Sequence, residues 1–488
     1  MPDLVLAIDQ GTTGTTAVLM DERSRIVASR NVEFLNHFPA PGLVEHEPAD
    51  IWTSIERAVT MALAGIDPHR IAAIGNTNQR ETSLFWSGTT GRAAHRALVW
   101  QDRRTAARCE ALRAEGWEDR VRARTGLVLD PYFSGTKAEW MLQNVPGVRA
   151  AATTGELRFG TIDSFVAWKL TGEHVTDPSN ASRTLLFDIH RMEWDEELLA
   201  LFGVPAACLP RVVDNAGVFG VTRGVGFLPD GIPVSGLAGD QQSALFGQAC
   251  FSPGMAKCTY GTGAFVLLNT GAQAVSSANG LLTTVAWRLG GEAVYALEGS
   301  AFIAGAAVQW LRDGLGFFSS SAEVEALAAS VPDAAGVTFV PALAGLGAPH
   351  WRPDARGVLS GLTRGTTRAH IARAVLEGVA LQITDILSAM AEDAGTPLAE
   401  LRVDGGAARN DLLMQFQADV LGVDCVRPTN LETTAMGAAY LAGLGVGFWS
   451  SPDAVRAAWA EDRRFTFGMD PETRRGRLAA WTTAVAKA

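Results

Sequence analysis

The chain has 488 residues, of which 47% are hydrophobic and 19% are charged, and its formal net charge is −11. This length predicts about two to four domains with full hydrophobic cores, and the composition excludes a disordered protein, a collagen and a small disulfide-bonded scaffold. Because an acidic surface does not attract phosphate polymers, we do not expect nucleic acid as a partner.

The cysteines and the apolar segments bear on where the protein works. The five cysteines are scattered and include no C-x-x-C pair, so the sequence predicts no zinc or redox motif and favours a cytoplasmic location. The first residues, MPDLVLAIDQGTTG, lack the basic segment of a signal peptide. The uncharged stretch 433–449 contains four glycines and is shorter than the about 20 residues of a spanning helix. It predicts a buried, closely packed helix without membrane insertion.

The predicted elements of the first half begin with two strands around a Gly/Thr turn. Residues 4–8 and 17–20 are the strands, and residues 10–16 form the turn. Further predicted elements are a strand at 70–75, a polar loop at 76–82, a strand at 232–237 and a helix at 243–248.

The second half repeats part of this order. Residues 256–269 predict two strands around another Gly/Thr turn, and residues 400–403 predict a strand that leads through DGGAARN into a helix. In that helix Leu413, Phe416 and Val420 share one face, and Gly422 marks its end. The segment 450–488 is amphipathic and charged, and we expect it to be helical and to pack on the outside.

The two halves of the chain share a weak internal echo, that is, a short sequence similarity. DQGTTG at 9–14 resembles YGTGA at 260–264, and each string lies between two predicted strands. We therefore expect a mixed α/β chain of two related domains, residues 1–247 and 248–488, each with one such turn beside a shared cleft.

The two Gly/Thr turns are candidate phosphate sites. Glycine allows close backbone approach, successive N–H groups can surround an anion, and a carboxylate such as Asp9 at a strand end can hold Mg²⁺ through water. An ordinary hairpin turn explains each string equally well when it is taken alone. The turns are neither a Walker A loop nor a Rossmann fingerprint, so those nucleotide folds are not supported.

Two further strand ends carry candidate functional groups. Asp240 follows an apolar strand and can accept a proton from a substrate hydroxyl, or it can cap the next helix. Asn410 can bind an adenine or cap its helix, and the glycines before it permit close contact with a flat ligand.

A third group of residues suits a small polyol. Arg80 and Glu81 can bind neighbouring hydroxyls, and Tyr132 adds a hydroxyl partner. Trp100 and Phe265 can pack against a carbon chain. The alternative is a solvated ion pair with ordinary core aromatics, which the residues taken singly favour.

Taken together, these segments resemble the FGGY family of carbohydrate kinases, and within it the members that phosphorylate glycerol. The resemblance covers nearly the whole chain. It rests on the ordered strings DQGTT (9–13), PGLVEHEP (41–48), TNQRET (77–82), RTGLVLDPYFSGTK (124–137), SNASRTLLF (179–187), GLAGDQQSALFGQ (236–248), YGTGAF (260–265), ANGLLTT (278–284), ALEGS (296–300), GLGAPHW (345–351), GLTRGT (361–366) and RVDGGAARNDLLMQFQAD (402–419).

The resemblance implies two ribonuclease H-like domains of the actin and hexokinase type with a cleft between them. It also implies transfer of phosphate from ATP to glycerol, giving sn-glycerol 3-phosphate, with Mg²⁺ as cofactor, and a homodimer or homotetramer. The residues that match the family positions are Asp240 as general base; Arg80, Glu81, Tyr132, Asp240, Gln241, Trp100 and Phe265 for glycerol; Thr12, Thr13, Gly14, Thr16, Thr262, Gly305, Gln309, Gly406 and Asn410 for the nucleotide; and Asp9 near Mg²⁺.

Three features depart from the family. An arginine usually follows the first turn, where this chain has Thr16. A threonine supplies no charge, which leaves two alternatives: weaker nucleotide affinity or a substitute cation. Residues 225–233 contain no arginine, and no histidine occurs between His190 and His350. Inhibition by fructose 1,6-bisphosphate and control by the phosphotransferase system are therefore not expected.

Three alternative functions remain open at this point. The first is a related kinase for another polyol or sugar. The second is an ATP-driven conformational protein with the same fold, which needs no polyol site. The third is a polyol sensor without catalysis. Thr16 supports this alternative, and Asp240 argues against it.

Overall fold

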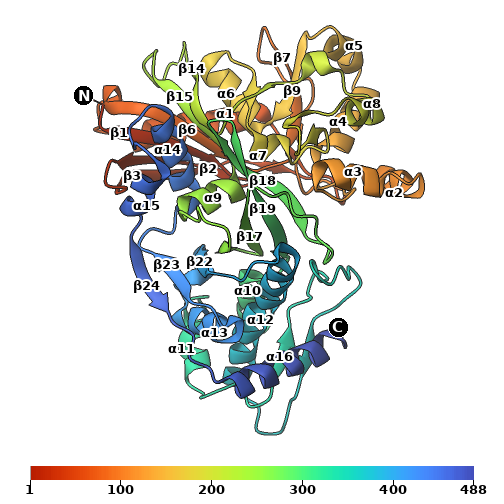
Figure 1. The fold of residues 1–488 in the computed structure, drawn as a ribbon, viewed down its shortest axis with the longest axis vertical. Coiled ribbons are helices and arrows are strands. Elements are labelled where there is room, and N and C mark those ends of the chain that lie inside the picture. Colours follow the sequence, from red (N-terminus) through yellow and green to blue (C-terminus); the bar gives the residue numbers. More distant parts are fainter. Residues whose placement is uncertain (1) are drawn as a thin grey trace.

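Two large β-sheets, one built mainly from each half of the chain, form the frame of the molecule (Figure 1). The structure, a computed structural model, describes residues 2–488. The first sheet has the order β14 (Ala216–Val221), β15 (Pro233–Gly239), β6 (Ile71–Asn78), β1 (Leu4–Gln10), β2 (Gly14–Asp21) and β3 (Ile26–Glu33). The second has the order β18 (Leu282–Leu289), β19 (Glu292–Ala301), β17 (Ala264–Gly271), β16 (Met255–Tyr260), β22 (Glu400–Asp404), β23 (Cys425–Pro428) and β24 (Glu461–Phe465).

The two sheets share one topology. In the first, β1, β2 and β3 are antiparallel neighbours, and β6 and β15 continue the sheet parallel to β1. In the second, β16, β17 and β19 are antiparallel, and β22 and β23 continue the sheet parallel to β16. Each sheet ends in an antiparallel edge strand, β14 or β24. The internal echo expected from the two turns is therefore confirmed at the level of whole sheets.

A smaller region of short strands and helices lies beside the first sheet (Figure 1). It contains a third sheet of β4 (Asn36–His37), β5 (Glu45–His46), β8 (Ala97–Leu98), β7 (Ser83–Ser87) and β9 (Leu157–Thr161), the strand pairs β10 (Val175–Thr176) with β13 (Arg211–Val212) and β11 (Phe187–Asp188) with β12 (Glu193–Trp194), and the helices α2 (Ala106–Ala114), α3 (Glu118–Thr125), α4 (Ser134–Asn144), α5 (Val148–Thr153), α7 (Pro178–Ala181) and α8 (Glu196–Phe202).

Helices cover both faces of the first sheet. The helices α1 (Pro48–Ala62) and α6 (Ile162–Thr171) bury one face, while α9 (Asp240–Gly247) and α14 (Thr433–Gly445) bury the other. Helix α14 comes from the second half of the chain, and glycines of the helix and of the sheet allow the close approach. A Cβ at Gly75 of β6 would overlap the backbone of Ala438, and a Cβ at Gly437 would overlap the backbone of Ser243. The prediction of a buried, closely packed helix here is confirmed.

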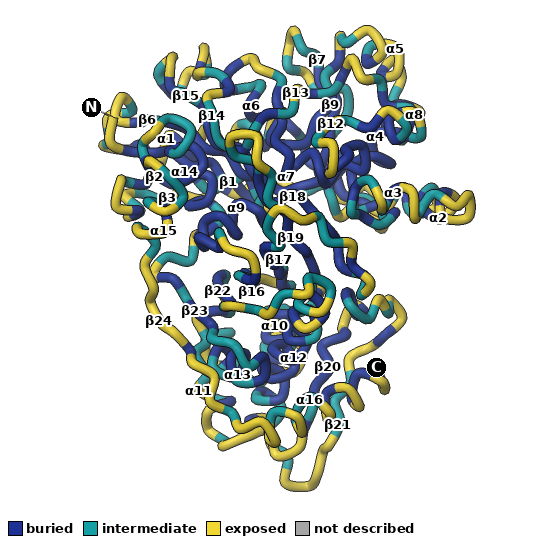
Figure 2. Tube along the Cα trace, in the orientation of Figure 1, coloured by how far each residue is buried: buried dark blue, intermediate teal, exposed yellow. Residues whose placement is uncertain are grey.

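The second sheet packs against one large core. That core includes residues of α10 (Gly305–Asp313), α11 (Glu323–Ala329), α12 (Arg368–Ala394), α13 (Asp411–Leu421) and α16 (Pro471–Val485), together with the strand pair β20 (Thr338–Val340) and β21 (Val358–Ser360). Figure 2 shows the buried segments along the two sheets and the exposed ones at the outer loops. Helix α12 has the length and apolar character of a membrane span, but 83% of its most apolar window is buried inside the molecule, as in a core helix.

The ends of α13 follow from its sequence. The Asn410 side chain accepts a hydrogen bond from the Leu413 N–H at 2.9 Å and caps the first turn. Gly422 ends the helix with a φ of 73°, and its N–H donates to Ala418. Leu413, Phe416 and Val420 are buried, as predicted for one apolar face.

Three sequence predictions need correction. Strand β6 runs through Asn78, so part of the predicted loop 76–82 is strand. Strand β2 begins at Gly14, which places Thr16 in a strand and not in the turn. The segment after residue 450 contains α15 (Pro452–Ala458) and α16, but β24 lies between them because it pairs with β23 and extends the second sheet.

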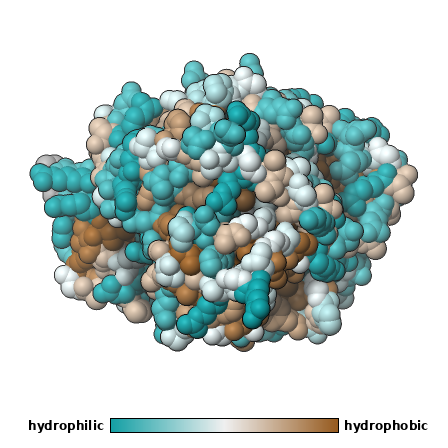
Figure 3. Space-filling view, turned by 90° about the horizontal axis from the view of Figure 1, so that it is seen from below, coloured by the Kyte–Doolittle hydropathy of each residue, from teal (hydrophilic) through white to brown (hydrophobic). Residues whose placement is uncertain are grey.

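The surface is mixed in character. On the face shown in Figure 3, hydrophilic residues are interspersed with smaller hydrophobic areas. Such a surface is ordinary for a globular protein. The division at residue 247 stays a prediction, and the packing of α14 on the first sheet shows that the chain crosses between the two halves.

Candidate active site

The first Gly/Thr turn joins β1 to β2. It is closed by a hydrogen bond from the Gly11 N–H to the Gly14 carbonyl, at 2.9 Å. Its Thr12 hydroxyl accepts a hydrogen bond from the Trp100 indole N–H at 2.9 Å, while Thr13 is exposed. Thr16 is on β2, where its hydroxyl accepts a hydrogen bond from the Asn31 amide at 3.0 Å. The predicted nucleotide residues of this turn thus lie together, beside the tryptophan predicted for glycerol.

The second turn joins β16 to β17 and is closed in the same way. The Gly261 N–H donates to the Gly263 carbonyl at 2.9 Å, and the Gly305 N–H at the start of α10 donates to the Gly261 carbonyl at 2.9 Å. A Cβ at Gly305 would lie 2.6 Å from that carbonyl oxygen, so this packing requires glycine. Thr262 and Gln309 are exposed. The structure therefore brings Thr262 and Gly305 together, with Gln309 one helical turn further along.

The third nucleotide segment follows β22. Gly405 has a φ of 85°, and a Cβ there would lie 2.6 Å from the Tyr260 carbonyl oxygen. The segment therefore packs on the end of β16, beside the second turn. Asn410 uses its side-chain oxygen as a helix cap, as one of the two sequence interpretations had it, while Gly406 is exposed. The cap leaves the two amide N–H groups of Asn410 as donors for a ligand.

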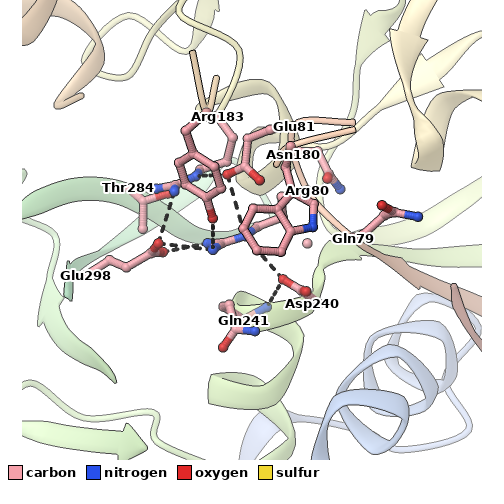
Figure 4. A network of polar contacts seen from close by, with 12 residues as sticks. Gln79, Arg80, Glu81, Asn180, Arg183, Asp240, Gln241, Thr284 and Glu298 are labelled. Carbon is pink, nitrogen blue, oxygen red and sulfur yellow. Dashed lines mark hydrogen bonds and ion pairs between the residues drawn. The ribbon is translucent and has the colours of Figure 1, made fainter. Parts of the chain in front are cut away.

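Arg80, Glu81 and Asp240, three of the predicted polyol residues, lie in one polar network (Figure 4), which Tyr132 joins through Arg80. Arg80 donates to the Tyr132 hydroxyl at 3.3 Å, and its Nε lies 3.2 Å from Asp240 Oδ1. The rings of Trp100 and Tyr132 are 5.5 Å apart in an edge-to-face arrangement. Phe265 is on β17, opposite Ser300 of β19, outside this network. The interpretation of Arg80 and Glu81 as a solvated ion pair is wrong, since both side chains are buried.

Two charged residues complete this network and were missed from the sequence. Glu298 of β19 accepts two hydrogen bonds from Arg80, at 2.5 and 3.0 Å, and a third from Arg183 at 3.0 Å. Arg183 also donates to Glu81 at 2.6 Å. Both residues lie in strings that carry the family resemblance, SNASRTLLF and ALEGS, and their charge among neutral residues was the available signal.

We call Arg80, Glu81, Arg183 and Glu298 the Arg–Glu ring. Burial alone would raise the pKa of Glu298, but Arg183 and Arg80 hold it at about 2. Burial raises the pKa of Glu81. The backbone of Glu81 has a positive φ of 61°. That left-handed backbone is uncommon for a residue with a Cβ and costs roughly 1–3 kcal/mol. The ring carries two positive and two negative charges and joins the first sheet to the second.

Asp240 is the first residue of α9, directly after β15. Its Oδ1 accepts a hydrogen bond from the Gln241 N–H at 2.7 Å, and its side chain is 29% exposed. The interpretation of Asp240 as a helix cap is wrong, because Gly239 occupies the cap position. Burial raises its pKa, and the charges of Arg80 and Lys257 oppose that rise. Asp240 is therefore a partly accessible carboxylate with raised basicity.

Asp9 at the end of β1 fits the carboxylate expected near a metal ion. Burial, together with the nearby Asp240 and Glu432, raises its pKa to about 8. A divalent cation would relieve this repulsion. Within residues 2–488 no group of three His, Cys, Asp or Glu side chains could hold a metal ion. A single carboxylate of this kind can hold a hard cation that keeps most of its water ligands.

Comparisons with known proteins show the family of the chain and its relatives. The model of the N-terminal domain of the FGGY family of carbohydrate kinases matches residues 4–247, and the C-terminal domain model matches residues 256–446. The chain is 58% identical to a glycerol kinase of Myxococcus xanthus over 99% of both chains, and 57% identical to one of Aromatoleum aromaticum over 99% of this chain and 98% of the other. The crystal structure of Plasmodium falciparum glycerol kinase with ADP is 37% identical and superposes with a TM-score of 0.95, covering 99% of this chain and 98% of that one.

Proposed function

The chain belongs to the FGGY family of carbohydrate kinases, and from that premise we propose that it transfers the γ-phosphoryl group of ATP to glycerol, forming sn-glycerol 3-phosphate. The observation that carries the proposal is the partly exposed Asp240 beside Arg80 and Tyr132. A conformational ATPase needs neither a base for an alcohol nor a set of polyol donors and acceptors.

The polyol set orients the acceptor. Arg80 and Glu81 bind neighbouring hydroxyls of glycerol, and Tyr132 and Gln241 add further hydrogen-bonding groups. Trp100 and Phe265 pack against the carbon chain. Because the Arg–Glu ring is buried and its members are hydrogen-bonded to one another, the donors and acceptors are positioned before the substrate enters.

Asp240 acts as the general base. Its raised pKa gives the carboxylate more affinity for the proton that leaves the attacking hydroxyl. The new bond joins the hydroxyl oxygen to the γ-phosphorus, and the bond to the bridging oxygen breaks, so that ADP leaves with the electron pair. Positioning and charge stabilisation account for most of the catalysis of such a transfer.

The nucleotide is held by the three glycine segments. Thr12, Thr13, Gly14 and Thr16 serve the phosphates from the first sheet, Thr262, Gly305 and Gln309 serve them from the second, and Gly406 and Asn410 serve the adenosine. Asp9 is the carboxylate that would hold Mg²⁺, and the ion would offset phosphate charge when bound.

Release of ADP from Mg-ATP, with and without glycerol, tests the proposal. Glycerol should stimulate release strongly, and a panel of other polyols and sugars at equal concentration should not. Stimulation by another polyol would keep the mechanism and overturn the substrate. Equal release without any polyol would favour an ATPase, and no release under any condition would favour the sensor.

Two further expectations accompany this function. All five cysteines are free and buried, which is consistent with the proposed cytoplasmic location. A homodimer or homotetramer is proposed from the family alone, and light scattering on the purified chain would measure it.

A further inference from the structure

Lys257 is a buried cation beside the proposed general base. It lies on β16, and its ammonium donates to the side-chain oxygen of Gln241 and to the Thr259 hydroxyl, the latter at 3.0 Å. Gln241 follows Asp240 at the start of α9, and Thr259 is two residues before the second turn. The ammonium therefore lies between Gln241, a residue predicted to bind glycerol, and the end of the strand that leads into the second turn.

This lysine has no carboxylate partner of its own. Within residues 2–488 no carboxylate oxygen lies within 4.0 Å of its nitrogen. The nearby Asp404 is instead satisfied by Gln248 and Thr433, each at 2.7 Å. A buried charge without a partner is costly unless something compensates it. The hydrogen bonds to two neutral oxygens leave one of the three N–H donors for an anion.

A second buried lysine shows the contrasting, structural case. Lys137 donates to three backbone carbonyls, those of Pro131, Tyr132 and Phe133. Its three donors are all used, and it fixes a turn. Lys257 is equally buried, but its ammonium makes two hydrogen bonds where that of Lys137 makes three.

The other cations near Asp240 are each paired with buried glutamates. Arg80 uses its donors on Glu298, Gln242 and Tyr132, with Asp240 at its Nε. Arg183 lies in the same neutral ring. The first turn brings no cation, because Thr16 stands where the family has arginine. Charge on a transferring phosphoryl group needs a protein cation or metal to offset it.

We propose that Lys257 is a catalytic residue whose ammonium binds an oxygen of the γ-phosphoryl group as that group passes from ATP to glycerol. The inference rests on the proposed function. Lys257 keeps its proton throughout, the hydroxyl proton goes to Asp240, and the electron pair of the broken bond leaves with ADP. The free N–H of Lys257 supplies the hydrogen bond.

The test compares Lys257→Met with the wild-type enzyme after glycerol-dependent ADP release has been shown for the latter. The variant should lose about 10²- to 10³-fold in kcat, as for loss of one preorganised donor. The KM for glycerol and the Kd for Mg-ADP should change by less than about threefold, because neither ground state contains the transferring group. Binding of aluminium fluoride with Mg-ADP and glycerol, which mimics the transferring phosphoryl group, should weaken in parallel with kcat.

Two further variants separate catalysis from structure. Lys257→Gln keeps hydrogen bonds to Gln241 and Thr259 without the charge, and it should lose kcat like Lys257→Met. Thr259→Val removes one hydrogen bond of Lys257 and keeps the charge, so its loss should be at least tenfold smaller. Near-normal kcat in Lys257→Gln would overturn the proposal, as would equal losses of glycerol, Mg-ADP and aluminium fluoride binding. Failure of the wild type to respond to glycerol would instead remove the proposed function.

Discussion

The turn between β1 and β2 and the turn between β16 and β17 occupy equivalent places in two sheets of one topology, yet their surroundings differ. Each is closed by a glycine N–H donating to a glycine carbonyl at 2.9 Å. Side chains support the first turn: Trp100 donates to Thr12, and Gln79 donates to the Gly11 carbonyl at 3.1 Å. The backbone of α10 supports the second, and Lys257 lies near it. The comparison teaches that two equivalent turns in a repeated fold can differ in charge. Here a cation, Lys257, lies near the second turn, and the side chains that support the first turn are neutral.

The largest expected effect concerns Asp240, which follows β15 of the first sheet and lies near both Asp9 and Lys257. Asp240→Asn keeps the shape of the side chain and removes the proton acceptor. We expect kcat to fall by about 10³-fold or more, within the range that general bases contribute together with charge, while glycerol still binds. Steady-state kinetics and calorimetric titration with glycerol measure both quantities. Near-normal kcat would remove the general-base assignment.

A pH titration should reveal the buried histidine that contacts a support of the first turn. His46 is buried, contacts Gln79 at 3.3 Å and bonds to Asn36. Burial, with a smaller effect of His37, lowers its pKa from 6.5 to about 4. Between these pH values the imidazole is protonated in the unfolded chain and neutral in the folded chain. The free energy of unfolding therefore falls as pH decreases from 6.5 towards 4. The slope is about 1.4 kcal/mol per pH unit, and the total loss is up to about 3 kcal/mol.

The matched control for this titration is His174, far from both turns in the sequence. Burial lowers its pKa to about 4 as well, and it bonds to the Phe159 carbonyl at 2.9 Å. His46→Gln and His174→Gln should each flatten the pH dependence of denaturant unfolding by a similar amount. We expect His46→Gln alone to change the KM for ATP, since His46 contacts the glutamine that supports the first turn. A change in both variants would contradict that link.

The acceptor glycines of the two turns should tolerate alanine unequally. A Cβ at Gly263 would lie 2.5 Å from the Ala301 carbonyl oxygen, whereas one at Gly14 would lie 3.0 Å from that of Val32. Backbone cannot move aside as a flexible side chain can, so Gly263→Ala should cost about 1–3 kcal/mol of unfolding free energy. Gly14→Ala should cost less. Urea unfolding of both variants gives the two values, and a larger loss for Gly14→Ala would contradict the comparison.

Some of these features could be predicted from the sequence and others could not. The turns, Asp240 and the α13 cap were predictable because each is a local pattern of strand, turn residue and helix. Arg80 and Glu298 are 218 residues apart, and no local pattern connects them. The sequence predicted Lys257 only as part of a strand, because Gln241 of α9 meets it only once the fold has assembled. The packing of α14 on the first sheet likewise depends on a chain crossing that periodicity does not encode.

The smallest expected effect comes from restoring a cation to the first turn. Thr16 pairs with Asp9 across β1 and β2 and with Asn31 across β2 and β3, so an arginine there would stand beside the strand that carries Asp9. Thr16→Arg should lower the KM for ATP by a few-fold, about 0.5–1 kcal/mol for a partly exposed ion pair. In a Lys257→Met background the same substitution should help more, because the γ-phosphate then lacks its other cation. Equal effects in the two backgrounds would mean that the two turns do not share this charge, and no effect in either would mean that the missing arginine is compensated elsewhere.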